Sequence, residues 1–132
     1  MKLKIALLLS ISLVALSLLG GCSAMSKMDE TKSLTITTPN YKKLLDGTYR
    51  GAYDGGLVIA EVAITIHAKD IQSVKLLRHD HGRGAEAEKI VDAIVEAQSL
   101  EVDVISGATV SSKAILRAAE NALRENAPRT EN

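Results

Sequence analysis

The sequence predicts an α+β domain in which a small antiparallel sheet of about three strands packs one face against two helices. Apolar and polar residues alternate over residues 57–78, and the apolar period becomes helical after Gly84. The candidate strands are separated by short turns, which favours antiparallel pairing. The 132 residues carry no net charge and include no Trp or Phe. We therefore expect one domain with an aliphatic core and no nucleic-acid partner.

Three strands are expected from the turn signals Asp46-Gly47 and Asp54-Gly55-Gly56. The first strand lies between these turns, at residues 48–53. The second covers residues 57–66 and the third residues 71–78, and both are rich in β-branched residues. The side chains expected to face the core from the second and third strands are Val58, Ala60, Val62, Ile64, Ile66, Val74 and Leu76.

Two amphipathic helices are expected after the strands, at residues 85–97 and about residues 110–124. In each segment, apolar residues recur at helical spacing while charged residues take the opposite face. The expected buried stripes are Ala87, Ile90, Val91, Ile94 and Ala97 in the first helix, and Val110, Ala114, Ile115, Ala118, Ala122 and Leu123 in the second.

The N-terminal residues predict export and a lipid anchor. Lys2 and Lys4 precede an apolar run, residues 5–19, that is shorter than a membrane span and typical of a secretory signal. Leu19-Gly20-Gly21-Cys22 resembles a bacterial lipobox, in which the cysteine is lipidated and becomes the N-terminus. The alternative is a chance cysteine beside an ordinary signal peptide. Cys22 is the only cysteine, so an internal disulfide is excluded.

These features divide the chain into four parts. Residues 1–21 form the lipoprotein signal peptide, residues 22–44 the lipidated cysteine and a polar tether, residues 45–126 the domain, and residues 127–132 a tail. Because residues 23–40 are polar and show almost no regular period, we expect them to hold the domain off the membrane. Two acyl chains on Cys22 would anchor the protein stably on the extracytoplasmic side.

The segment from Asp103 to Thr109 carries the expected chemistry. Ser106-Gly107-Ala108-Thr109 opens the second helix, where unpaired backbone N–H groups and the helix dipole favour a phosphate. Gly107 lets a ligand approach the backbone closely, and Thr109 presents a hydroxyl at the same place. The alternative is an ordinary helix cap, since Ser and Thr are common in that role.

Asp103 through Thr109 resembles the flavinylation motif of the FMN-binding domain family. That motif is an Asp, two variable residues, Ser or Thr, then Gly-Ala-Thr, and it also occurs in the sodium-pumping NADH:quinone reductase. The resemblance covers nearly all of the domain. It implies that a flavin transferase joins the FMN phosphate to the Thr109 hydroxyl. The rest of the implied motif is Asp103, Ser106, Gly107 and Ala108.

The loop His79-Asp80-His81-Gly82-Arg83-Gly84 admits three interpretations. It is a metal site, a solvated turn, or a wall of the flavin site. Neighbouring loop positions rarely converge on one ion without a further ligand, so we predict no metal. The resemblance implies that the loop borders the flavin, and we expect Gly82, Arg83 and Gly84 to contact it. For Tyr49 and Tyr53, on one face of the first strand, we expect edge packing rather than stacking on the flavin ring.

FMN would supply the redox chemistry while the protein holds it and adjusts its electronic properties. We find no candidate catalytic acid, base or nucleophile and no nicotinamide-binding glycine motif. The sequence therefore predicts an electron carrier rather than a self-sufficient enzyme. Its expected partners are the membrane, a flavin transferase, and membrane or extracellular redox proteins. The alternatives are a lipid-anchored binding module without a redox role and a protein that binds FMN reversibly.

The Cys22 hypothesis predicts that a radiolabelled fatty acid fed to the host labels the wild-type protein but not Cys22→Ser. Only the thiol can accept the diacylglycerol, and the chain has no other cysteine. Equal labelling of the two proteins would contradict the hypothesis.

Overall fold

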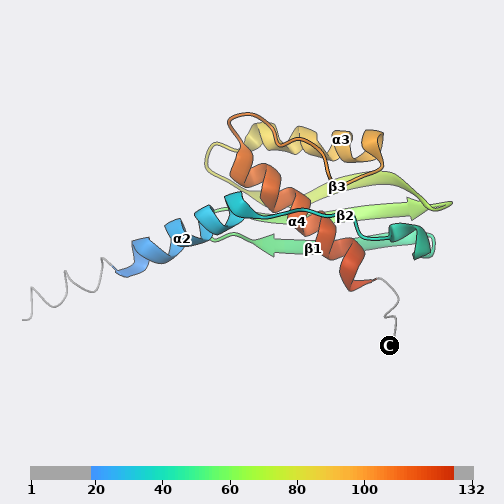
Figure 1. Cartoon of the computed structure of the whole chain (residues 1–132), viewed down its shortest axis with the longest axis horizontal. Helices are drawn as coiled ribbons and strands as arrows, with labels where there is room; N and C mark the ends of the chain where they lie inside the picture. The colour runs from blue at the N-terminus through green and yellow to red at the C-terminus, as the bar shows by residue number, and fades with distance from the viewer. Residues whose placement is uncertain (1–18, 127–132) are drawn as a thin grey trace, which may run out of the picture.

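An antiparallel sheet of three strands, in the order β1-β2-β3, forms one layer of the structure (Figure 1). The structure is a computed structural model, and it describes residues 19–126. The strands are β1 (Gly47–Asp54), β2 (Ile59–His67) and β3 (Asp70–Asp80). The other elements are α2 (Leu19–Ser33), η1 (Tyr41–Lys43), η2 (Ala85–Lys89), α3 (Ile90–Ala97) and α4 (Thr109–Glu125).

The strand pairing confirms the predicted α+β meander. Gly47 pairs with Ile66 and Asp54 with Ile59, while β2 turns into β3 through Ala68 and Lys69, both at positive φ. The predicted apolar face of β2 is buried, and Val74 and Leu76 of β3 pack in or against the same core. The register between β2 and β3 shifts at two places, so simple alternation along β3 does not persist.

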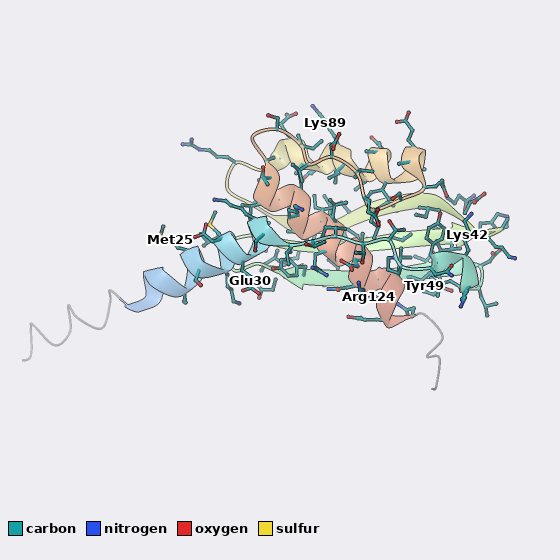
Figure 2. All side chains as sticks on the ribbon, viewed as in Figure 1. Met25, Glu30, Lys42, Tyr49, Lys89 and Arg124 are labelled. Atoms are coloured by element: carbon teal, nitrogen blue, oxygen red, sulfur yellow. The ribbon has the colours of Figure 1, made fainter. Side chains whose placement is uncertain are left out.

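Helices α3 and α4 cover one face of the sheet, with α4 packed on β1 and β2 and α3 packed on β3 (Figure 1). Side chains fill the space between these layers, whereas Lys89 lies at the surface (Figure 2). The predicted first helix is divided into the 3₁₀ turn η2 and the short helix α3. Ala97, expected in its buried stripe, is exposed because the helix ends there. Helix α4 begins at Thr109, one residue before the predicted start.

The approach of α4 to the sheet depends on the absence of a side chain at Gly51. A Cβ at this position would lie 2.2 Å from the Ala118 carbonyl oxygen and 2.3 Å from the Ala122 nitrogen. Backbone therefore packs directly on backbone, which only glycine permits here. On α4, the residues nearest to this contact are alanines with no exposed surface, Ala118 and Ala122.

The Gln98 side chain joins the end of α3 to β3. Its amide group makes two hydrogen bonds with the backbone of Ile71, as a neighbouring strand would. Gln98 adopts the left-handed conformation that ends the helix. Its Oε1 accepts from Ile71 N at 2.8 Å, and its Nε2 donates to Ile71 O at 2.9 Å. This pair satisfies backbone groups that would otherwise be left without partners at the core boundary.

The segment before the domain, expected to be a polar tether without regular structure, contains a helix. Residues 19–33 form helix α2, and Thr31 on it is buried against Tyr53, with 3.1 Å between their hydroxyl oxygens. The chain then runs along α4, where Lys113 Nζ donates to Leu34 O at 2.7 Å. Polar side chains make these contacts, and for this reason the apolar periodicity did not predict them.

The Gly51 contact predicts that Gly51→Ala destabilises the fold by about 1–3 kcal/mol, the range typical of overpacking. The new methyl group would force α4 away from β1. Urea denaturation followed by circular dichroism measures the free energy of unfolding. Gly47→Ala is the matched control, because its Cβ would meet no atom closer than 3.9 Å. Equal stability of the two variants would contradict this account of the packing.

Candidate functional site

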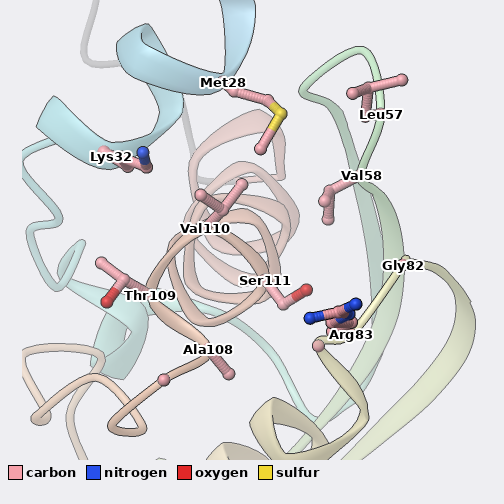
Figure 3. Close-up of a pocket in the computed structure, with 12 residues that line it drawn as sticks. Met28, Lys32, Leu57, Val58, Gly82, Arg83, Ala108, Thr109, Val110 and Ser111 are labelled. Carbon is pink, nitrogen blue, oxygen red and sulfur yellow. The ribbon is translucent and has the colours of Figure 1, made fainter. Parts of the chain in front are cut away.

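A pocket of about 410 Å³ opens at the N-terminal end of α4 (Figure 3). This volume lies within the range of known small-molecule sites. Three segments distant in sequence meet there: α2, the turn before β2, and the loop that follows β3. The lining residues are Met28, Lys32, Leu57, Val58, Gly82, Arg83, Gly84, Gly107, Ala108, Thr109, Val110 and Ser111.

The floor of the pocket is the turn that leads into α4. Ala108 N donates to Ile105 O at 3.0 Å, and Ile105 N donates to the buried Ser112 Oγ at 3.0 Å. Gly107 lies within this turn at φ +78°, and a Cβ there would meet nothing within 4 Å. The hydrogen bond from Ile105 to Ser112 therefore holds the turn in place, and the side of the turn at Gly107 is open to a ligand.

The start of α4 offers hydrogen-bond donors to that ligand. The residue that caps the helix is Ala108, which makes no side-chain capping bond, and Thr109 is the first helical residue. The first N–H groups of any α-helix lack acceptors within the helix, and the dipole is positive at this end. The cap position is therefore not taken by Ser106 or Thr109, which argues against the interpretation of these residues as an ordinary cap. The Thr109 side chain is exposed and borders the same pocket.

The opposite wall is the Gly82–Gly84 loop. A Cβ on Gly84 would lie 1.9 Å from Ser111 Oγ and 2.7 Å from Ser111 Cβ, so the loop and α4 touch directly. A Cβ on Gly82 would meet nothing within 4 Å. Gly84 therefore holds the loop against the helix, while Gly82 leaves room on the side of the pocket, and Arg83 between them lines the same space.

Charge distinguishes this pocket from a second cavity of about 520 Å³ beside α3. Among residues 19–126, the first is lined by two basic residues, Lys32 and Arg83, and by no acidic residue. Within the same residues, the second is lined by Glu96, Glu101 and Asp103 and by no basic residue. A phosphate would be attracted to the first and repelled by the second, although the second is larger.

Comparison with known proteins identifies the domain. Residues 58–124 match the FMN-binding domain, and these are 67 of the 132 residues. The chain belongs to the FMN-binding domain family, and its cofactor is FMN. A protein of Treponema pallidum (strain Nichols) described as uncharacterized is 35% identical over 89 residues. That alignment covers 65% of this chain and 25% of the Treponema pallidum protein, so this chain spans about a quarter of its relative's length.

The pocket suits FMN in both the charge and the apolar character of its lining. A phosphate at the start of α4 would meet backbone donors and the basic side chains of Lys32 and Arg83. The apolar lining, from Met28, Leu57, Val58 and Val110, suits the flat isoalloxazine ring. In the part of the chain that the structure describes, no aromatic residue lines the pocket. Methionine sulfur makes favourable contacts with aromatic rings, which makes Met28 a suitable neighbour for the flavin.

The structure brings six of the eight predicted cofactor residues to this pocket: Gly82, Arg83, Gly84, Gly107, Ala108 and Thr109. Asp103 and Ser106 are exposed and lie outside it, with Asp103 on the second cavity. Sequence reasoning missed Met28 and Lys32, because α2 was expected to be a tether. No periodic signal in that segment indicated a pocket wall.

The two tyrosines of β1 pack at the sheet and do not line the pocket. Tyr49 donates its hydroxyl to Leu45 O at 2.7 Å, and Tyr53 hydrogen-bonds with Thr31. Both rings are partly buried against the core. Their contacts agree with the expected edge packing.

The close contact at Gly84 predicts that Gly84→Ala weakens reversible FMN binding to the flavin-free chain. The methyl group would push the loop away from Ser111 and distort the pocket wall, at an overpacking cost of about 1–3 kcal/mol in stability. Quenching of flavin fluorescence measures the affinity. Gly47→Ala is the matched control and should keep both affinity and stability, since Gly47 lies on β1 outside the pocket and its Cβ would meet no atom closer than 3.9 Å. Unchanged binding by Gly84→Ala would contradict the assignment of this wall.

Proposed function

We propose that the protein is a lipid-anchored, extracytoplasmic electron carrier whose FMN is bonded through its phosphate to Thr109. The observation that carries the proposal is the position of the Thr109 hydroxyl. It is exposed, it begins α4, and it borders a pocket that attracts phosphate. The resemblance of Asp103–Thr109 to the flavinylation motif supports the same residue.

The covalent bond would form by substitution at phosphorus. Thr109 Oγ would attack the flavin phosphate of an activated donor bound to a flavin transferase, displace the donor's leaving group, and release its own proton to solvent. An exposed hydroxyl suits this reaction, because an external enzyme must reach it. Asp103 and Ser106 are also exposed but lie away from the pocket, and we assign them to recognition by the transferase.

A carrier role is favoured over a self-sufficient enzyme by the chemistry of the pocket. FMN supplies electron acceptance and donation. Among the described residues, the ionisable side chains that line the pocket are Lys32 and Arg83. Both are suited to binding a phosphate rather than to moving protons on a second substrate. The protein would therefore hold and orient the flavin, while neighbouring redox proteins serve as donor and acceptor.

The lipid anchor is proposed from Cys22, which lies in α2. Cleavage before Cys22 would leave the rest of this helix at the new N-terminus. Met28 follows six residues later, which corresponds to about 9 Å along a helix axis. The pocket would then stand close to the membrane surface, where membrane oxidoreductases can reach its flavin. None of the described helices is long and apolar enough to cross a bilayer.

The proposal predicts that Thr109→Ala abolishes covalent flavin, since only a hydroxyl can form the ester, while Thr109→Ser retains some. Asp103→Asn should reduce flavinylation more than it reduces stability. Intact mass and in-gel flavin fluorescence, after coexpression with a flavin transferase, measure attachment. The unfolding free energy of Thr109→Ala should remain close to that of the wild type, because Thr109 does not cap α4.

Thr48→Ala is the matched control, because Thr48 is another exposed threonine and lies on β1 away from the pocket. It should be flavinylated like the wild type. An FMN-sized mass increment on Thr109→Ala would place the attachment elsewhere. A wild-type chain that binds FMN but never gains this increment in a competent host would leave reversible binding as the function.

A further inference from the structure

A second cluster of polar side chains lies beside the flavin pocket and has no part in the function proposed above. His79 and His81 at the end of β3 meet Glu88 on η2. One ligand atom from each residue lies within 4.8 Å of the others. The three residues therefore converge on one point, although they come from two elements of the fold.

An irregularity in the sheet directs the two histidines toward this point. Leu76 pairs with Val62, but the register shifts at Glu61, and His79 then pairs with Ala60. Without the shift, Arg78 would share the core-facing side of Leu76. The bulge turns His79 to that side instead, and His81, two residues later, follows it. Bulges that redirect a side chain in this way are common beside functional sites.

Each of the two histidine rings has one buried nitrogen without a hydrogen-bond partner. The His79 side chain is 2% exposed and that of His81 is 23% exposed. His79 Nε2 and His81 Nδ1 are the two buried side-chain nitrogen or oxygen atoms in the described chain that lack a hydrogen-bond partner. A buried nitrogen without a partner costs free energy. These two atoms are not the ring nitrogens that face Glu88, and the atoms that could bind an ion together with Glu88 are His79 Nδ1 and His81 Nε2.

The spacing suits a metal ion. His79 Nδ1 lies 3.2 Å from Glu88 Oε1, and His81 Nε2 lies 3.9 Å from the same oxygen. Ligands about 2.0–2.2 Å from a tetrahedral zinc ion are separated by about 3.4 Å from one another. We propose that His79, His81 and Glu88 bind a divalent transition metal ion such as Zn²⁺.

Two features define the ion's surroundings. Asp80, between the histidines, points to Arg78, and the hydrogen bond from that guanidinium lowers the pKa of Asp80. Asp80 is therefore paired with Arg78, and the third protein ligand is Glu88 of η2. Glu88 is half-exposed, so the side of the ion near Glu88 is open to a water molecule as the fourth ligand. Imidazole nitrogens favour zinc and its neighbours over Mg²⁺, which prefers oxygen ligands.

The ion would also fasten the loop that borders the flavin pocket. His81 Cβ lies 3.4 Å from the position that a Cβ on Gly84 would take. Residues 82–84 follow His81 directly, and η2 with Glu88 begins one residue after Gly84. A metal bound to both ends of this segment would hold the loop between them. The site would thereby stabilise the pocket wall without touching the flavin.

The test is Zn²⁺ titration of the flavin-free, full-length chain with Cys22→Ser, which removes the thiol as a competing ligand. Isothermal calorimetry should show one Zn²⁺ per chain, Mg²⁺ should not bind, and Zn²⁺ should raise the melting temperature. Glu88→Gln and His81→Ala should each weaken Zn²⁺ binding by at least about tenfold. Cobalt substitution should give the visible absorption of a tetrahedral ion, which Glu88→Gln alters.

His67→Ala and Glu86→Gln are the matched controls. His67 is an exposed histidine paired with Asp46, and Glu86 is an exposed glutamate of η2 paired with Lys89. Both variants should bind Zn²⁺ like the parent chain. Glu88→Gln replaces a half-exposed group and keeps the fold, so a folding failure of His81→Ala would not remove the test. No stoichiometric Zn²⁺ binding by the parent, or equal binding by Glu88→Gln, would overturn the proposal.

Discussion

The contact of α4 with Gly51 determines where the rest of the site lies. Because Gly51 has no side chain, the backbone of α4 at Ala118 and Ala122 rests directly on β1. This contact sets the position of the helix over the sheet. The first turn of α4 is then held next to Val58 and the Gly82–Gly84 loop (Figure 3). The N-terminus of any helix attracts anions. At the start of α4, two basic side chains add to this attraction: Lys32 from α2 and Arg83 from the loop.

The charge of the lining, rather than the volume, decides which of the two cavities suits a phosphate. The larger is acidic and the smaller is basic, and the larger is lined by residues 103–105 while the smaller is lined by residues 107–109, the two ends of the motif. Its final residues, Gly107 to Thr109, line the basic pocket, whereas Asp103 lies outside it and is exposed. In the function proposed above, this division would let one short segment serve both cofactor binding and recognition by the transferase.

Local periodicity predicts the three strands, the two helices that cover the sheet and most of the core. The change from period two to helical period fell where β3 gives way to η2, and the start of α4 was displaced by one residue. Features that depend on tertiary contacts were not predictable. The bulge that turns His79 inward leaves no trace in the pattern of apolar residues, and Glu88 belongs to the next element. Helix α2 was missed because its contacts, such as Thr31 with Tyr53, are polar.

We place FMN in the pocket at the start of α4. Amide chemical shifts of the ¹⁵N-labelled, flavin-free chain, recorded during titration with FMN, locate the bound flavin. We expect the largest changes at Gly82–Gly84 and at Gly107–Ser111, with little change along the second cavity. Changes centred on residues 93–104, or none at the start of α4, would contradict it.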